Sequence, residues 1–182
     1  MVNRAHPGSL YEQALSLAQD IFDTDGSRGN ADKVCAVALH VADDSSVALF
    51  SGGPGYNALV KRIGGNAGDA KRAITDTLTQ FLRSEAGGGF TDQQINHHGL
   101  DQHGRGAMNC AEPKVFYYIT AVKKSAAANW ILIPFNQTGG GLVYNPPCMN
   151  CRRWVYRHFH NLTQAVAQER GGPNAFINAR LN

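Results

Sequence analysis

The chain has 182 residues, of which 43% are hydrophobic and 17% charged, and its formal net charge is +3. This size and apolar content predict a single domain over residues 1–182 with a well-buried core. The sequence has neither the apolar run of about eighteen residues that a membrane span needs nor the basic-then-apolar start of a signal peptide, so we expect no membrane partner. The net charge is modest beside that of domains that bind duplex nucleic acid strongly, and charge alone does not identify a substrate.

Helices and strands are expected to alternate along the chain. Apolar residues at helical spacing predict a first helix over residues 10–22. Two β-rich runs, 34–41 and 46–51, are separated by a short turn-forming stretch and predict a hairpin. A second helix is expected over 69–82, within a region from 52 to 109 that also holds two Gly-rich loops.

The second half of the chain continues the alternation. A helix is expected to begin at Cys110, a strand follows over 130–135, and a long helix is expected from Cys148 to about Ala167. A last strand fits at 175–179. Strand, helix and strand in succession favour an α/β fold in which a mixed central sheet lies between helical layers.

Two short motifs supply three thiols and one carboxylate: Cys110-Ala111-Glu112 and Pro147-Cys148-Met149-Asn150-Cys151. Three protein ligands leave a zinc ion a fourth position for water, whose pKa the metal lowers toward about 7. A glutamate that does not bind the metal, here Glu112, can take the proton of that water, pass it to a ring nitrogen and later help an amino group leave as ammonia. Prolines near both motifs suit helix starts, whose partial positive charge stabilises thiolates. The motifs therefore predict a catalytic zinc site.

A structural zinc site would need a fourth protein ligand. The remaining cysteine, Cys35, lies in an apolar run and is expected in the core. The alternative is a site completed by a histidine, with His158 and His160 as candidates, but His158 lies about two helical turns beyond Cys151, too far for the same ion. Three thiolates around a divalent cation leave a charge of about −1, and Arg152, next to Cys151, is expected to offset it from behind the ligands.

The segments CAE and PCxxC followed by Arg resemble the cytidine deaminase superfamily, and CAEPK with PCMNC is similar to deaminase domains of bacterial polymorphic toxins, particularly the YwqJ-like group. The resemblance implies a three-layer α-β-α sandwich with a mixed central sheet. Carried over position by position, it makes Cys110, Cys148 and Cys151 the zinc ligands and Glu112 the proton shuttle. Relative to the small nucleoside enzymes of that superfamily, residues 52–109 are an insertion near the mouth of the site.

Five residues are candidate substrate contacts. Tyr144 and Asn145 directly precede the second motif and are expected at the rim of the metal pocket. Asn57 falls in a loose match to the stretch that holds the nucleoside in small cytidine deaminases, and Arg105 lies just before the first motif. His103 belongs to a histidine-containing stretch that suits contact with the base 5′ to the target better than a second metal, because its spacing matches no known ligand pattern.

The inserted region also holds basic and aromatic side chains that suit contact with a single strand of nucleic acid. The alternative is that the basic residues are solvated on helix faces and the aromatic residues belong to the core. These residues are Lys61, Arg62, Lys71, Arg72, Tyr56 and Phe90.

The sequence therefore favours a zinc-dependent cytosine deaminase that acts on nucleic acid, with single-stranded DNA as the first substrate and RNA as the second, because a base stacked in a duplex is out of reach. The alternatives are a deaminase of free cytidine or deoxycytidine and a zinc-stabilised binding module without catalysis; the motif also permits a purine substrate. With three of four cysteines assigned to metal, we expect a reducing site of action such as the cytoplasm. The resemblance to toxins adds delivery into a target cell and a neutralising immunity protein as expectations.

Overall fold

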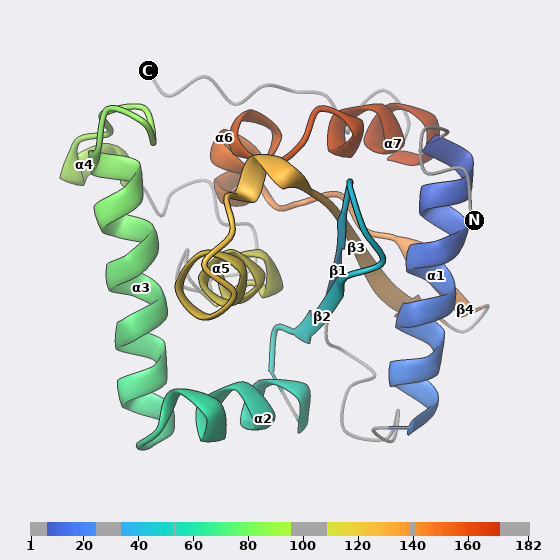
Figure 1. Ribbon diagram of the computed structural model, residues 1–182, viewed down its shortest axis with the longest axis horizontal. Helices are drawn as coiled ribbons and strands as arrows, with labels where there is room; N and C mark the ends of the chain where they lie inside the picture. The colour runs from blue at the N-terminus through green and yellow to red at the C-terminus, as the bar shows by residue number, and fades with distance from the viewer. Residues whose placement is uncertain (1–6, 25–33, 53, 96–108, 139–140, 172–182) are drawn as a thin grey trace.

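The computed structural model describes residues 7–24, 34–52, 54–95, 109–138 and 141–171. In these ranges a four-stranded sheet is covered by helices on both faces, which makes a three-layer α-β-α sandwich (Figure 1). The predicted fold class is confirmed at this level. None of the helices described is both long and apolar enough to cross a lipid bilayer. The strand predicted at 175–179 lies outside the described residues.

The sheet consists of β1 (Val34–His40), β2 (Ser46–Phe50), β3 (Trp130–Thr138) and β4 (Gly141–Tyr144), in the order β2-β1-β3-β4. β1 and β2 form the predicted hairpin. Every strand pair in the described chain is antiparallel, where a mixed sheet was predicted. β2 and β3, the strands joined through helices, are not neighbours, because β1 lies between them and pairs antiparallel with both. β4, which was not predicted, follows β3 after two residues, too few for the crossover helix that a parallel neighbour requires.

The central strand β1 lies between β2 and β3, and it is buried on both faces because helices cover both sides of the sheet. Side chains alternate along a strand, so its odd-numbered residues, Cys35 among them, enter the core beneath helix α1 (Pro7–Thr24), which confirms the predicted first helix. Cys35 is fully buried, as predicted. The small side chains of Ala36 and Ala38 face the other way and leave room for α5 (Ala111–Tyr117), which lies against β1 and β2.

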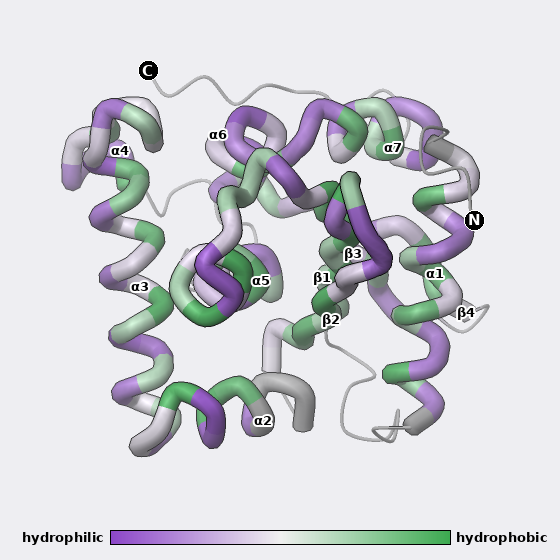
Figure 2. The backbone as a smooth tube through the Cα atoms, viewed as in Figure 1, coloured by the Kyte–Doolittle hydropathy of each residue, from purple (hydrophilic) through white to green (hydrophobic). Residues whose placement is uncertain are grey.

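The described part of the inserted region forms three helices on the α5 side of the sheet: α2 (Pro54–Ile63), α3 (Ala67–Arg83) and α4 (Asp92–Ile95) (Figure 1). α3 confirms the predicted helix and starts at a capping box between Asn66 and Asp69. In Figure 2, α1 and α3 alternate between hydrophobic and hydrophilic residues, the pattern of helices with one buried face. α2 was not predicted, because a Pro-Gly pair indicates a turn although proline also suits the first helical position.

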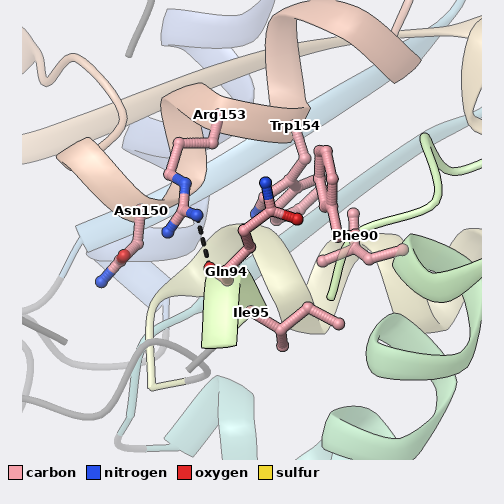
Figure 3. Close-up of a pocket in the computed structure, with 7 residues that line it drawn as sticks. Phe90, Gln94, Ile95, Asn150, Arg153 and Trp154 are labelled. Atoms are coloured by element: carbon pink, nitrogen blue, oxygen red, sulfur yellow. Dashed lines mark hydrogen bonds between the residues drawn. The ribbon is translucent and has the colours of Figure 1, made fainter. Parts of the chain in front are cut away.

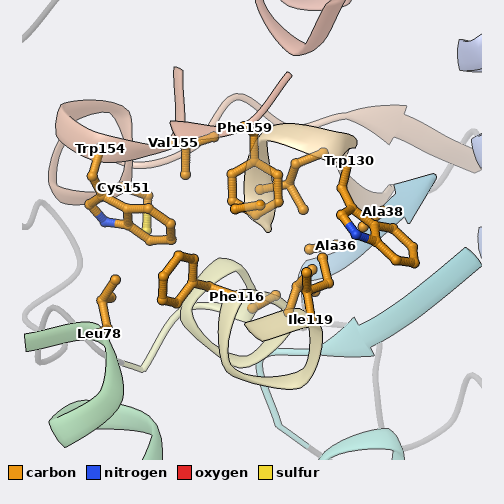
Figure 4. Close-up of a cluster of buried hydrophobic side chains, with 14 of the residues drawn as sticks. Ala36, Ala38, Leu78, Phe116, Ile119, Trp130, Cys151, Trp154, Val155 and Phe159 are labelled. Carbon is orange, nitrogen blue, oxygen red and sulfur yellow. The ribbon is translucent and has the colours of Figure 1, made fainter. Parts of the chain in front are cut away.

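Aromatic side chains fill the core on the α5 side of the sheet. Phe116 on α5 meets Trp154 edge to face, with ring centroids 5.6 Å apart, and both are buried. Figure 4 shows these two rings between Leu78 of α3 on one side and Phe159 and Trp130 on the other. This packing holds together the helices that carry the two sequence motifs.

The predicted helix over 148–167 is in fact two helices, α6 (Met149–His158) and α7 (Leu162–Gly171). The chain leaves the helical conformation at Phe159, where φ is −80° and ψ is 165°. Phe159 packs in the α5-side core, whereas Val166 on α7 packs in the core beneath α1. The break therefore lets one segment serve both faces of the sheet.

The break between α6 and α7 also supplies hydrogen-bond partners for the backbone of the part of β3 that does not pair with β4. The backbone N–H of His160 donates to the Trp130 carbonyl, and the N–H of Leu132 donates to the hydroxyl of the buried Thr163. Buried strand groups without partners would cost free energy, so these bonds favour the broken helix over a continuous one. Periodicity alone misses this, because the donors and acceptors of β3 are remote in the sequence.

Candidate metal centre

The two predicted motifs lie at the starts of α5 and α6. Cys110 and Cys148 are the N-cap residues of these helices, both in extended conformation, and neither side chain makes the hydrogen bond that a cap side chain normally makes. Their thiols instead face each other, with 3.4 Å between the two Sγ atoms. Cys151, in the first turn of α6, completes the group.

The geometry of the three thiols suits a single metal ion. All three Sγ atoms lie within 4.8 Å of one another. A tetrahedral zinc ion with bonds of about 2.3 Å would separate its sulfur ligands by about 3.8 Å, so small side-chain rotations bring the group around one ion. All three cysteines are free; Cys151 is buried and the other two are partly buried. The predicted ligands thus come together, and within the described residues they form the one group placed to hold a metal ion.

The proton equilibria of the three thiols are linked. Hydrogen bonds from Cys110 and then Cys151 to its thiolate hold the pKa of Cys148 far below its usual value. The pKa of Cys110 is raised chiefly by its hydrogen bond with Cys148, and that of Cys151 by its hydrogen bond with Cys110. The metal-free group therefore carries one thiolate and two thiols. Metal binding releases the remaining two protons.

Glu112 lies in the first turn of α5 and is only 2% exposed. Burial, and after it the charge of Cys148, raises the pKa of its carboxyl to about 7. Its Oε2 atom is buried and has no hydrogen-bond partner among the residues that the structure describes. Such an orphaned oxygen costs roughly 1–3 kcal/mol, which a bound ligand would recover. A carboxyl group that titrates near neutral pH can both take and give a proton.

The structure adds Lys114, which the sequence patterns did not predict. Its side chain is 3% exposed, and Nζ donates to the carbonyl oxygens of Asn109 and Cys110, at 2.8 and 2.9 Å. Burial lowers the pKa of Lys114 to about 8, and the acidic groups nearby, first Cys110 and then Glu112, oppose this shift. One thiolate with two thiols, and three thiolates with a divalent ion, both carry a charge of about −1. A single buried ammonium suits either state.

Arg152 occupies the equivalent position on α6. It follows the N-cap Cys148 by four residues, as Lys114 follows Cys110, and its Nε donates to the Pro147 carbonyl at 2.6 Å. Each N-cap ligand is therefore followed by a basic residue that reaches back to the carbonyl group just before the ligand. A basic residue four positions after a ligand at a helix start is the sequence signal that would have found Lys114.

The residues predicted at the rim of the site are held by the protein itself. The hydroxyl groups of Tyr144 and Tyr156 are 3.5 Å apart, and burial raises the pKa of Tyr144. The ring of Tyr144 packs against the α1-side core, so the aromatic face is part of the fold. The backbone N–H of Asn145 donates to the Pro134 carbonyl at 2.9 Å and continues the pairing of β4 with β3.

The other predicted contacts are exposed, belong to the core or fall outside the described residues. Asn57 is exposed on α2. Phe90, predicted as a stacking surface, is 8% exposed and belongs to the core, so the alternative interpretation of that ring is correct. Arg105 and His103 lie outside the described residues, as does the side chain of Tyr56.

The two histidines considered as a fourth ligand have other partners. The Nε2 atom of His158 lies 2.9 Å from the Gly87 carbonyl, to which its N–H donates, and the ring packs edge to face on Phe81. The Nδ1 atom of His160 accepts from the Leu162 N–H. Neither histidine belongs to the three-cysteine group. A structural site completed by either of them is therefore not supported.

Comparisons with family models, with curated proteins and with solved structures found no match. Fold and site by themselves define the class: an α/β sandwich with three cysteines that can hold a metal ion at two helix starts. A buried glutamate of raised pKa adjoins them.

Proposed function

We propose that this protein is a zinc-dependent hydrolytic deaminase that converts cytosine to uracil in nucleic acid, with single-stranded DNA as the first substrate and RNA as the second. The observation that carries the proposal is the buried, orphaned carboxylate oxygen of Glu112 beside three thiols that leave one position of a tetrahedral ion open. A closed structural site would have no use for an acid of raised pKa at its edge.

Zinc bound at the three thiolates would supply an acidified water as the nucleophile. Glu112 would take one proton of the water on its carboxyl group and deliver it to the ring nitrogen; it would then take the second proton of the same water and deliver it to the departing amino group. One water molecule is consumed and one ammonia molecule released, so Glu112 ends the cycle as it began. Lys114 and Arg152 do not touch the substrate; they hold the backbone that carries Cys110 and Cys148.

A polymer substrate is favoured by the charge of the helices beside α5. Lys61 and Arg62 form the basic last turn of α2, and Lys71 and Arg72 follow on α3; all four are exposed. Exposed cations can neutralise phosphates, for which a free nucleoside offers no counterpart. The three thiols require a reducing environment to stay free, so we place the site of action in a cytoplasm.

The test is conversion of cytosine to uracil by zinc-loaded protein on single-stranded DNA, duplex DNA, RNA and free cytidine in parallel. Glu112→Gln is the matched control, because it keeps the shape of the side chain and removes the acid. We expect turnover of single strands only, and a loss of at least 100-fold in the variant at equal zinc content. Turnover of cytidine alone would replace the proposal by a nucleoside deaminase. Equal rates in wild type and Glu112→Gln would reject catalysis by this site.

A further inference from the structure

Asn150 is a buried amide that lacks partners. It lies between the two cysteines of α6, is 5% exposed, and neither Oδ1 nor Nδ2 has a hydrogen-bond partner in the described part of the chain. Each such group costs roughly 1–3 kcal/mol when it stays unpaired. An apolar side chain of similar shape would avoid that cost. Contacts within the described chain therefore do not explain why an amide occupies this position.

Asn150 lines a recess between α6 and the segment that runs from the end of α3 to α4 (Figure 3). Phe90, Ile95 and Trp154 form its apolar wall. The empty space in the recess, about 310 Å³, includes space open to solvent, so the recess is a partly open hollow and not an enclosed cavity. Asn150 directly precedes Cys151, so the recess adjoins the turn of α6 that also carries this thiol.

Arg153 brings positive charge to the same recess. It lies three residues after Asn150 and therefore on the same face of α6. Figure 3 shows its guanidinium pointing to the backbone carbonyl of Gln94, to which Nη2 donates. This bond ties α6 to α4 and holds the recess in shape.

The lining identifies the chemistry of the occupant. No carboxylate, thiol or imidazole is among the described lining residues, so the recess does not suit a metal ion. The wall is mostly apolar, which a phosphate alone would not match. The amide offers one donor and one acceptor side by side, and the matching groups stand side by side on the edge of an unpaired nucleobase.

We propose that this recess binds the edge of the nucleobase next to the target cytosine and that Asn150 reads it with its donor and acceptor together. The proposal rests on the proposed function, which it deepens: the site requires an unpaired neighbour and therefore a single-stranded polymer. Base pairing in a duplex would occupy the edge that Asn150 needs.

The test combines a protein variant with a chemical change in the substrate. Short single-stranded oligonucleotides carry one central cytosine, with an intact or an abasic nucleotide at the 5′ or the 3′ neighbour. Binding is measured by fluorescence anisotropy with zinc-loaded Glu112→Gln protein, with and without Asn150→Leu. We expect one abasic neighbour to weaken binding about tenfold in the Asn150 protein. Asn150→Leu should weaken binding of the intact strand by the same factor. The affinity of this variant should then be the same for the intact and the abasic strands.

Thermal unfolding separates this role from a structural one. Asn150→Leu removes two unpaired buried polar atoms, so its melting temperature should equal or exceed that of the parent. Asn150→Ala serves if leucine does not fit, and Asn161→Leu makes the same chemical change at an exposed position. A lower melting temperature in both Asn150 variants with no coupling to the abasic change would overturn the proposal. Coupled binding without any deamination by wild-type protein would retain the recess and reject the proposed function.

Discussion

Replacement of Lys114 by methionine removes an ammonium group that holds the start of α5, while the length of the side chain is retained. Lys114 is 3% exposed and bonds the carbonyl oxygens of Asn109 and Cys110 at 2.8 and 2.9 Å. Without these bonds the N-cap backbone of Cys110 is no longer fixed before the metal arrives, because its thiol makes no capping bond either. Metal binding would then have to order that backbone, so the variant should bind zinc more weakly.

The expected loss of zinc affinity follows from the number of residues whose backbone is no longer held in place before the metal binds. Ordering the backbone of one residue costs about 1–2 kcal/mol, which corresponds to a zinc affinity about 5- to 30-fold lower. This agrees with the roughly 10- to 100-fold losses seen when groups that support metal ligands are removed. The charge of the group contributes little to this difference, because the site carries about −1 with and without a divalent ion.

The assay is competition for zinc with a chromophoric chelator. Lys114→Arg keeps charge and donors and should retain most of the affinity, and Lys61→Met removes a lysine that is exposed on α2. Circular dichroism of the metal-free proteins shows whether each variant folds. Equal zinc affinity in wild type, Lys114→Met and Lys114→Arg would refute the reasoning that Lys114 preorganises the site.

Two further predictions concern stability. Cys35→Ala should lower the unfolding free energy by about 1–2 kcal/mol, because this thiol is fully buried. It should leave the zinc stoichiometry at one per chain, since burial raises the pKa of Cys35 to about 12 and places it in the core. A lost zinc equivalent would contradict that assignment. Burial lowers the pKa of His158 below 6.5, so its stabilising contribution is complete above about pH 6.5 and is lost as pH falls through the lowered value. The melting temperature of metal-free wild type should therefore fall more steeply below pH 6.5 than that of His158→Gln, and parallel curves would contradict this.

Local sequence was sufficient for the parts of the site whose geometry is local. The cysteines of PCMNC are three residues apart, so a helix that begins at Cys148 places both on its first turn. The same holds for Glu112 in the first turn of α5. The hairpin β1–β2 and helices α1 and α3 were likewise predicted, because their periodic apolar residues match one face of the element.

Contacts between remote segments were beyond prediction from these patterns. Apolar periodicity continues from Phe159 to Val166, yet the helix breaks because β3 needs a donor from His160 and an acceptor from Thr163. Phe90 looked like a loop aromatic and is core, because α3 and α6 close over it. In each case the deciding partner is remote along the chain.

The sequence by itself determined the candidate site residues: three thiols, one carboxyl group, and their places at two helix starts. Only the tertiary structure decided that Cys110 and Cys148, 38 residues apart, bring their sulfur atoms within 3.4 Å, and that Lys114 and Asn150 are buried. The physical reason is that ligand identity and helix position depend on neighbours in the chain. The burial of Lys114 and Asn150 and the convergence of the thiols depend instead on how α5 and α6 pack against each other. Hydrophobic burial is non-directional, so a local pattern of apolar residues does not specify which segment an element packs against.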